Sequence, residues 1–493
     1  MKKTGIALGV LLAAGAVCTG GAWYTAGQLE GALQGAISEG NRQLQTSMPG
    51  SGLALELVSL ERGLFSSTAR YRLRLDKPGD EEPAAELRFV DHIEHGPLPL
   101  SRLASLRWLP VMATSRVELE RNADVEPWFA AAGAAVPLRG TFAIGYGGGV
   151  DGQLQLAPLQ VVAEGEKLDF SGLDLDLAVG ADAKDIRLSG AVERLSLDLQ
   201  HERGPVRISL NGLSLDSERS RGRSTLYMGE SRLALASSEI RLADQPPLLI
   251  RDLVQSDSLH EQGERIAASL AYDVGGLSYD GHELGSARLQ LSLGNLDMTA
   301  LRQLSELYTR YAMRLQGEDD FELSAEEETR LRDALLQLLA GQPRLALDEW
   351  RVKTASGESR FTLQLDLDRP QQLEASPDAL ARQLIQRLQA SLVVGKPMIR
   401  DLLMLQAVFD PQADRAALSQ EAEQAAQMAG EMASGLQLAR LEGENIVARL
   451  DYRDGQVEFN GVSMPVEQFA AQMMGMAALG GDAFGSQPGA LQE

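Results

Sequence analysis

The sequence predicts an α+β protein dominated by β-structure, in which an N-terminal transmembrane helix precedes an extended antiparallel sheet with packed helices. Three observations indicate this fold class. The only long uncharged apolar run stands at the N-terminus, strand-like alternation of leucines with polar residues recurs through residues 51–296, and helical periods appear between strands after residue 297. Apolar positions at every second residue are typical of strands, whereas a period of three to four is typical of helices.

Composition excludes one broad class of partner. The 493 residues include 46 Lys plus Arg and 69 Asp plus Glu, which gives a net charge of −23. Such a charge opposes binding to nucleic acid or to an anionic membrane surface, and we expect no nucleic-acid partner. Aromatic residues make up only 5% of the chain while hydrophobic residues make up 44%, so the core is expected to consist mainly of Leu, Ala and Val.

The N-terminal segment, residues 1–27, predicts a transmembrane signal anchor. Lys2 and Lys3 precede an uncharged run that contains Trp23 and Tyr24 near its end. At about 1.5 Å per residue, a helix of this length spans a bilayer core. The lysines would stay in the cytoplasm, and the two aromatic rings would mark the far interface. We therefore predict a single-pass protein of the cell inner membrane, with the bulk of the chain in the periplasm.

Two other fates of this segment stay open. Gly20-Gly21-Ala22 offers small residues to a signal peptidase, which would release the rest of the chain. Cys18 allows a lipoprotein, but Val17 stands where the lipobox has a small residue. Because Cys18 is the only cysteine, the exported part has no disulfide and no thiol nucleophile.

Four further regions follow the anchor. Residues 28–50 keep a rough helical period up to a Pro-Gly pair, which predicts a juxtamembrane helix. Residues 51–296 predict a β-rich region of mostly antiparallel strands, separated by turns of Gly, Asn, Asp and Ser. Residues 297–480 predict a mixed α+β region, and residues 481–493 predict a disordered tail.

Several helices of the mixed region have recognisable ends. Ser324 with Glu327 forms a capping box at the start of one helix. Ser376-Pro377 opens another helix, whose inward positions would be Leu380, Leu384 and Leu388. The Ala-rich residues 416–438 favour a helix by propensity, and Asp454-Gly455 predicts the turn of a hairpin.

Four stretches together resemble a known family. They are the anchor ending in "GAWYTAGQLE", then "ERGLFSSTARYRLRL", "HIEHGPLPL" and "DYRDGQVEFNGVSMP". In this order they resemble the YdgA-like family of Gram-negative inner-membrane proteins, and the likeness spans nearly the whole chain. The resemblance implies an exported, membrane-anchored protein of largely undefined function, with self-association as an option. It supplies no catalytic residues.

The same stretches supply candidate structural or binding residues. We expect Gly63 to take a backbone conformation that is costly for other residues, with Leu64 and Phe65 entering the core. His95, Gly96 and Pro97 are expected to form a fixed bend. The full set of candidates is Arg62, Gly63, Leu64, Phe65, His95, Gly96, Pro97, Asn460 and Gly461.

The search for catalytic motifs favours no reaction. His92, Glu94 and His95 suggest a metal site, but their spacing does not match the zincin patterns, so a structural bend is preferred. "GGGVDG" fits a dinucleotide-binding pattern, but a predicted strand follows where the phosphate needs a helix. We therefore expect no cofactor and no metal, and the sequence leans away from an enzyme.

Two functions remain. The preferred one is a non-enzymatic scaffold or homo-oligomeric binding module of the envelope that contacts an envelope protein, a lipid or another apolar ligand. The Leu-rich strand faces would be either ordinary core or a surface for acyl chains. The alternative is a periplasmic hydrolase whose site is assembled only in the fold.

The Ala-rich helix carries the prediction of a homo-oligomer. Ala425, Ala429 and Ala433 lie on one side of it, and Met428 and Met432 accompany them. Such a helix can be buried against the same helix of a second copy.

Overall fold

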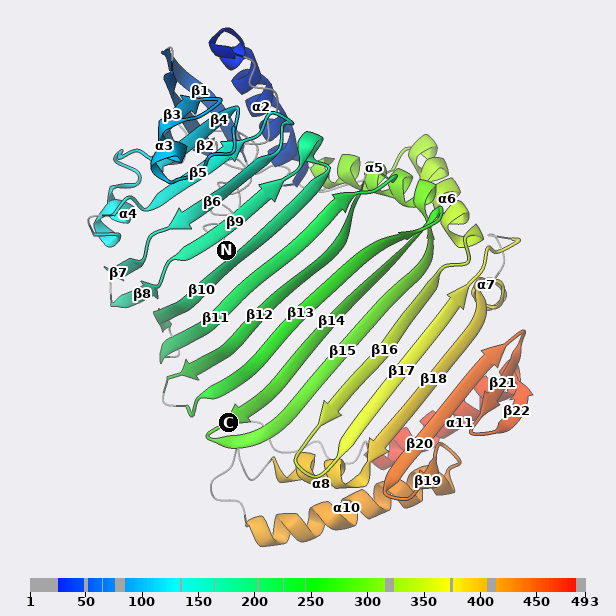
Figure 1. The fold of residues 1–493 in the computed structure, drawn as a ribbon. Coiled ribbons are helices and arrows are strands. Elements are labelled where there is room, and N and C mark those ends of the chain that lie inside the picture. The colour runs from blue at the N-terminus through cyan, green and yellow to red at the C-terminus, as the bar shows by residue number, and fades with distance from the viewer. Residues whose placement is uncertain are drawn as a thin grey trace. The chain divides into compact units, whose positions relative to one another are not determined.

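The computed structural model describes most of the chain from Thr25 to Phe484 (Figure 1). The predicted anchor, with Lys2, Lys3, Trp23 and Tyr24, lies outside the described residues except for its last three positions, which begin a helix. No helix within the described ranges is both long and apolar enough to cross a membrane. The described ranges are 25–47, 52–63, 65–75, 85–133, 135–163, 165–201, 204–224, 226–243, 245–314, 323–372, 376–405 and 414–484.

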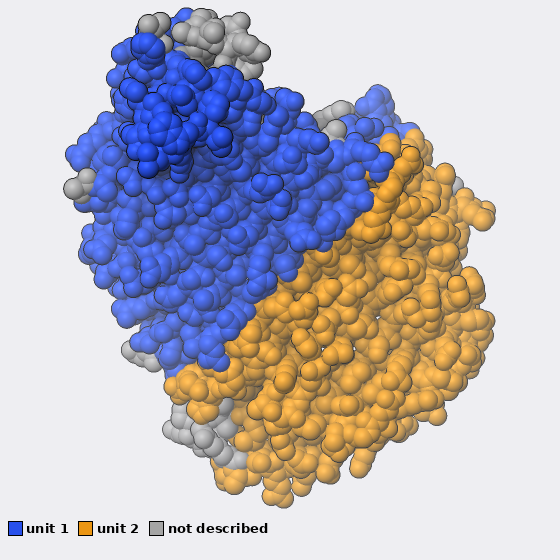
Figure 2. Space-filling view, viewed as in Figure 1, with its two compact units in different colours: residues 1–261, 302–331 blue, residues 262–301, 332–493 orange. Residues whose placement is uncertain are grey.

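The chain divides into two compact units (Figure 2). Unit 1 comprises residues 1–261 and 302–331, and unit 2 comprises residues 262–301 and 332–493. The chain passes between the units at the end of β13 (Leu248–Gln262) and within two helices, α5 (Met298–Arg314) and α6 (Ala325–Ala340). Antiparallel strands dominate both units, which confirms the prediction of a β-dominated α+β fold.

Unit 1 begins with a helix and continues as a chain of antiparallel strands. The strands pair in the order β1-β2-β3-β4-β5-β6-β9-β10-β11-β12-β13, and the β7–β8 hairpin adds to β10 through β8. The elements are α2 (Thr25–Ser47), β1 (Leu53–Arg62), β2 (Ser66–Leu75), β3 (Ala85–His95), α3 (Leu100–Ala104), β4 (Ala113–Leu119), α4 (Glu126–Ala131), β5 (Leu138–Ile144), β6 (Val150–Leu156), β7 (Leu159–Ala163), β8 (Glu166–Phe170), β9 (Leu173–Val179), a 3₁₀ turn (Ala181–Ala183), β10 (Asp185–His201), β11 (Gly204–Arg221), β12 (Tyr227–Leu242) and β13 (Leu248–Gln262).

The hydrophobic core of unit 1 lies between α2, α4 and strands β1–β6 and β9. Leu33, Ile37 and Leu44, which follow the predicted helical period, are buried on the face of α2 that packs against β1. Asn41 of α2 donates to the carbonyl of Leu55 and accepts from its N–H, at 2.9 and 2.8 Å. The predicted juxtamembrane helix is therefore a covering layer of the sheet and not a free stalk.

Unit 2 repeats the antiparallel arrangement. The order is β14-β15-β16-β17-β18-β20-β21-β22, and the short β19 also pairs with β20. Its elements, besides the start of α5 and the end of α6, are β14 (Arg265–Tyr279), β15 (His282–Asp297), β16 (Arg344–Lys353), β17 (Glu358–Leu367), α7 (Pro377–Leu384), β18 (Ile385–Gly395), α8 (Lys396–Met404), α10 (Arg415–Gly435), β19 (Arg440–Glu442), β20 (Asn445–Arg453), β21 (Gln456–Phe459), β22 (Val462–Pro465) and α11 (Val466–Phe484).

The helix ends follow the sequence signals with one exception. The predicted capping box forms, since Ser324 N–H and Oγ–H both donate to Glu327 and Glu327 N–H faces Ser324 Oγ at 3.4 Å. The hairpin turn at Asp454-Gly455 also forms, with left-handed φ values of 49° and 78°.

The helix opened by Ser376 is shorter than predicted. It ends at Leu384, and Leu388 lies in β18 opposite Leu365. The prediction for Leu388 was wrong because the sheet ladder overrides the local helical period. At the C-terminus, α11 continues to Phe484, past the start of the predicted tail, and the residues beyond it lie outside the described ranges.

Candidate functional site

One face of the unit 2 sheet is apolar across six strands. Residues directly opposite one another in an antiparallel pair share a face, so the strand register shows which side chains lie together. Three consecutive rows on one face consist almost wholly of apolar residues. They are Tyr272, Leu289, Trp350, Phe361, Leu392 and Ala448, then Leu270, Leu291, Leu347, Leu363, Ala390 and Leu450, and then Ala268, Leu293, Leu345, Leu365, Leu388 and Tyr452. We call these eighteen residues the apolar face.

A bulge in β16 keeps this face continuous. Trp350 and Leu347 are three residues apart, which in a regular strand would place them on opposite faces. Their partners in β15, Leu289 and Leu291, are two residues apart, and the register shifts between Leu347 and Trp350. The extra residue therefore brings Trp350 to the same face as Leu347.

The residues of the apolar face are exposed or half-buried, except Tyr452, which is buried. Trp350 is 53% exposed, and Tyr272, Leu291, Leu293, Leu345 and Leu392 are each 37% to 41% exposed. A contiguous exposed apolar surface of this kind is uncommon in soluble monomeric proteins and marks a binding surface. This face is the main candidate functional site.

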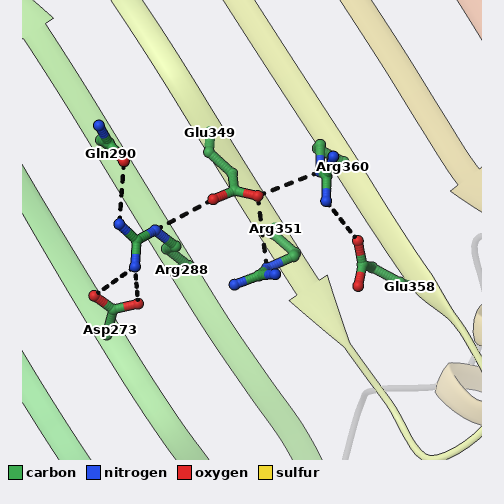
Figure 3. A network of polar contacts seen from close by, with 7 residues as sticks. All are labelled: Asp273, Arg288, Gln290, Glu349, Arg351, Glu358 and Arg360. Carbon is green, nitrogen blue, oxygen red and sulfur yellow. Dashed lines mark hydrogen bonds and ion pairs between the residues drawn. The ribbon is translucent and has the colours of Figure 1, made fainter.

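The opposite face of the same strands is charged and internally paired (Figure 3). The Glu349 carboxylate contacts the guanidinium groups of Arg288, Arg351 and Arg360 at 3.2, 3.7 and 3.3 Å. Arg288 also donates to both carboxylate oxygens of Asp273, at 2.8 and 3.0 Å. These groups satisfy one another, so the charged face needs no ligand to neutralise it.

Strands β10–β13 of unit 1 show the same two-faced pattern. One row on the apolar side is Leu168, Leu197, Ile208, Ile240 and Leu248, and the row two residues along is Phe170, Leu195, Leu210, Ser238 and Ile250. On the opposite side, the row next to Leu197 holds Asp198, Arg207 and Arg241, with Arg207 paired to Asp198 at 2.6 Å. The apolar residues of these rows are half-buried.

The side of the Ala-rich helix α10 that is buried within this chain is not the side that carries the alanines predicted to face a second copy. It packs on α8 (Figure 1), and Ala422, Ala426 and Gly430 are its buried positions. Ala425, Ala429 and Ala433 are only half-buried. Met428 and Met432 are 57% and 49% exposed, so these two side chains remain available to a second copy.

The predicted turn and bend of unit 1 lie side by side. His95 N–H donates to the Phe65 carbonyl at 2.9 Å. Gly63 does not have a positive φ; instead, a Cβ at this position would overlap the carbonyl oxygen of Ser66. A Cβ on Gly96 would likewise overlap the Val111 carbonyl, and the Gly96-Pro97 peptide is cis. Gly63 and Gly96 are therefore required by close backbone approach.

Two expectations for this turn have different outcomes. Phe65 does not enter the core, because its side chain is 77% exposed. Leu64 lies outside the described residues. Arg62 ends β1 opposite Ser67.

β3, the strand that ends at His95, also carries a buried carboxyl group. Asp91 is buried and accepts hydrogen bonds from Ser115 Oγ at 2.7 Å and Tyr71 Oη at 3.3 Å. Burial raises the pKa of the Asp91 carboxyl to about 6, although these hydrogen bonds act in the opposite direction.

His95 and Ser67 form a partly buried contact on the same face of the sheet. His95 Nε2 lies 2.9 Å from Ser67 Oγ, and burial lowers the pKa of the imidazole. This is the pairing of a hydrolytic nucleophile and its base. However, Ser67 is only 4% exposed and faces the core with Ile93, so a substrate carbonyl cannot reach the hydroxyl in this conformation.

The suspected metal residues are separated by the sheet. Side chains alternate faces along β3, so His92 and Glu94 point away from the face that carries His95. Glu94 accepts from the N–H and Oγ–H of Ser101, at 2.9 and 2.7 Å. Among the described residues, no group of three or more His, Cys, Asp or Glu is placed to hold a metal ion.

Asn460 and Gly461 form a hairpin turn in unit 2, with φ values of 50° and 80°. Asn460 Nδ2 donates to the carbonyls of Gln437 and Leu438 at 3.3 and 3.1 Å, and its Oδ1 accepts from Arg449 N–H at 2.8 Å. It thereby ties the β21–β22 hairpin to the chain that leaves α10. The turn borders a hollow of about 610 Å³, lined also by Arg440 and Arg449.

Sequence reasoning missed two features. The first is the set of cross-strand apolar rows, which can be recognised only from the register between strands. The available signal was the alternation of leucines in successive strands. The other missed feature is residues 98–109, where Leu98, Leu100, Leu106, Trp108 and Leu109 are exposed. Leucines and a tryptophan next to Arg102 and Arg107, with no acidic residue nearby, were the signal there.

Comparison with known proteins identifies relatives over nearly the full length. Residues 1–467 match the family described as "Bacterial protein of unknown function (DUF945)". The chain is 30% identical to Protein YdgA of Escherichia coli over 97% of this chain and 98% of that protein. It is 23% identical to the uncharacterized protein YihF of the same organism, over 94% and 98% of the two chains.

A third relative covers less. An uncharacterized protein of Haemophilus influenzae is 31% identical over 34% of this chain and 46% of its own length. No solved structure matches the fold. These matches confirm the resemblance to the YdgA-like family.

Proposed function

The chain belongs to the DUF945 family of bacterial proteins, and on that premise we propose that it is an inner-membrane-anchored protein of the periplasm that binds phospholipid acyl chains on the apolar face. The observation that carries this proposal is that three apolar rows run across six paired strands with exposed residues in four of them, Trp350 most of all. The protein would act as a binding module and not as an enzyme.

The dimensions of the apolar face favour an elongated ligand. Six strands at about 4.8 Å spacing extend about 24 Å across the ladder. The rows are lined by leucines with Tyr272, Trp350 and Phe361. Apart from the buried Tyr452, such a surface offers apolar contact and no hydrogen-bonding side chain except Tyr272 and Trp350 in one row, which suits a hydrocarbon chain.

The electrostatics of the sheet supports the same choice. The charged groups of the opposite face are paired with one another (Figure 3), and charged ladders of this kind keep that side in water. The two faces therefore differ in what they can contact: the apolar face gains free energy only by leaving water, whereas the charged face loses it.

A photocrosslinker placed on each face tests the proposal. Benzoylphenylalanine at Trp350 reports on the apolar face, and at Arg351, the next residue, on the charged face. In membranes with radiolabelled phospholipid, we expect lipid adducts at position 350 to exceed those at position 351 several-fold. Equal labelling at both positions, or adducts to protein alone at position 350, would contradict lipid binding.

A matched pair of substitutions sharpens this test. Leu291→Glu places a carboxylate on the apolar face, and Gln290→Glu places one on the opposite face of the same strand. We expect the first to reduce the adduct at position 350 strongly and the second to leave it unchanged, because a carboxylate is costly to transfer into hydrocarbon.

The location is tested separately. Alkaline phosphatase fused after Glu493 should be active, and carbonate washing should leave the chain in the membrane fraction, because residues 1–27 are predicted to anchor it. A soluble protein whose mature N-terminus is Trp23 would instead indicate a cleaved signal peptide.

A homo-oligomer is the second candidate, and the exposed Met428 and Met432 favour it. Both lie on α10, outside the apolar face. A dimer formed through α10 is therefore compatible with a lipid bound on the sheet, and each of the two proposals can be tested without the other.

A further inference from the structure

Exposed apolar side chains gather at one end of unit 1, at the loop between β3 and β4. They are Phe65, Leu98, Leu100, Leu106, Trp108 and Leu109, which we call the apolar tip, and their exposure runs from 43% to 77%. The His95 N–H bond to the Phe65 carbonyl joins the β1–β2 turn to the start of this loop. The Arg102 guanidinium donates to the Leu109 carbonyl at 3.2 Å and so holds the loop closed.

The backbone of the tip is held in a costly conformation at an apolar residue. Leu106 has φ of 57°, and the bonds from Arg107 N–H to Arg102 O and from Leu106 N–H to Leu103 O form the motif that usually ends a helix with glycine. Leu106 is nevertheless a leucine, and its side chain is 73% exposed. Core packing cannot explain its presence, whereas contact with an apolar environment would remove the cost of hydrating it.

The charge of the tip differs from that of the chain. No acidic residue occurs between Glu94 and Glu118, and this stretch contains Arg102 and Arg107, although the net charge of the protein is −23. Arginines beside a tryptophan and leucines are the composition that binds at the interface of an anionic bilayer.

The tip also lies toward the start of α2. The connection from α2 to β1 is short, and Asn41, about two turns before the end of α2, bonds to Leu55, two residues into β1. The two elements therefore run antiparallel, so β1 ends, at the turn that carries Phe65, toward the end of α2 from which the predicted anchor extends.

We propose that the apolar tip docks on the surface of an anionic phospholipid bilayer, as a second contact beside the N-terminal anchor. Trp108 and the leucines would enter the headgroup region, and Arg102 and Arg107 would contact lipid phosphates. This inference uses the anchor of the proposed function but does not depend on a ligand at the apolar face.

The test uses the full chain in vesicles of phosphatidylethanolamine and phosphatidylglycerol. With Cys18→Ser as background, an environment-sensitive fluorophore is attached at Leu109→Cys or at Val162→Cys. Val162, on β7, is the matched control because its exposure of 76% equals that of Leu109 at 77%. We expect nitroxide-labelled lipids to quench the fluorophore at position 109 several-fold more than at position 162.

Charge reversal at Arg107 identifies the headgroup contribution, because Arg102 also holds the loop closed. Arg107→Glu, or replacement of phosphatidylglycerol by phosphatidylcholine, should reduce quenching at position 109 and leave position 162 unchanged. Equal quenching at the two positions would overturn the proposal. Protection of position 109 from an aqueous quencher without quenching by lipid would also overturn it, in favour of a protein partner. The lipid adduct at position 350 is measured in a separate experiment. Failure of the apolar-tip proposal can therefore be distinguished from failure of lipid binding at the apolar face.

Discussion

The first strands of unit 1 and the long strands of unit 2 have the same sequence pattern but opposite surroundings. In β2, Tyr71 and Leu73 alternate with arginines and are 2% exposed. In β15, Leu291 and Leu293 alternate with polar residues in the same way, yet they are 38% and 40% exposed. Both strands show the same alternation, so the difference lies in what covers them.

In unit 1 the cover is supplied by the chain itself. Leu33, Ile37 and Leu44 of α2 join the strand residues in one core. In unit 2, the buried positions of α8 and α10, such as Met398 and Ala426, lie at the ends of the strands and not over the apolar face. A period of two therefore specifies which residues share a face, but not whether that face becomes core or binding surface.

The difference between the two regions should be largest in the loss of stability when one large side chain is truncated in each. Phe142 is fully buried, and its ring fills the space beside Gly140, where an added Cβ would lie 2.5 Å from the ring. Phe142→Ala should lower the free energy of unfolding by about 3–5 kcal/mol, whereas Leu291→Ala should change it by less than about 1 kcal/mol. Denaturant unfolding followed by circular dichroism measures both. Similar losses would mean that the apolar face is covered in solution.

The buried Asp91 makes the stability of the covered region depend on pH. Its folded pKa of about 6 lies above the unfolded value of 3.8, so this group favours the folded state below pH 4, and that contribution is lost as pH rises through 6. The loss amounts to about 3 kcal/mol. Asp91→Asn should therefore become more stable relative to the wild type between pH 4 and pH 7.

The lowered pKa of His95 makes stability depend on pH in the opposite direction. Its contribution to stability is present above the unfolded pKa and is lost as pH falls. Because both proteins contain His95, the difference in stability between Asp91→Asn and the wild type reports on the aspartate. A difference that does not vary with pH would show that Asp91 is not buried as a protonated acid.

The turn at Gly63 should be more sensitive than an open position. Gly63→Val places a side chain against the Ser66 carbonyl and should lower stability by about 1–3 kcal/mol. Gly133→Val is not a suitable control, because that glycine has a positive φ, whereas Gly31→Ala in α2 meets nothing within 4 Å and should be neutral or stabilising. An unchanged melting temperature for Gly63→Val would show that Gly63 is not required for the structure of this turn.

The smallest effect on stability is expected at α10. Met428→Glu with Met432→Glu changes two exposed side chains, so stability should stay within about 0.5 kcal/mol of the wild type. The same variant should dissociate a dimer if α10 forms its interface. Analytical ultracentrifugation in detergent measures this, and Gln427→Glu on the same helix is the control. A wild-type monomer would exclude the proposed dimer.

Some features followed from local chemistry and were predictable from the sequence. The capping box at Ser324 and the turn at Asp454-Gly455 need only neighbouring residues. The amphipathic face of α2 was readable from its period, but its burial against β1 was not. Phe65 was misassigned to the core because an apolar residue in a turn gives no sign of whether anything lies above it.

The sequence by itself determined the β-dominated fold, the alternation that separates apolar from charged side chains, and the membership of the family. The tertiary structure decided how the strands are aligned. Only the bulge between Leu347 and Trp350 places both residues on one face, and only the register aligns Leu289, Trp350 and Phe361 in one row. The physical reason is that a strand fixes its own two faces, whereas its register and its cover depend on hydrogen bonds and packing with segments distant in sequence.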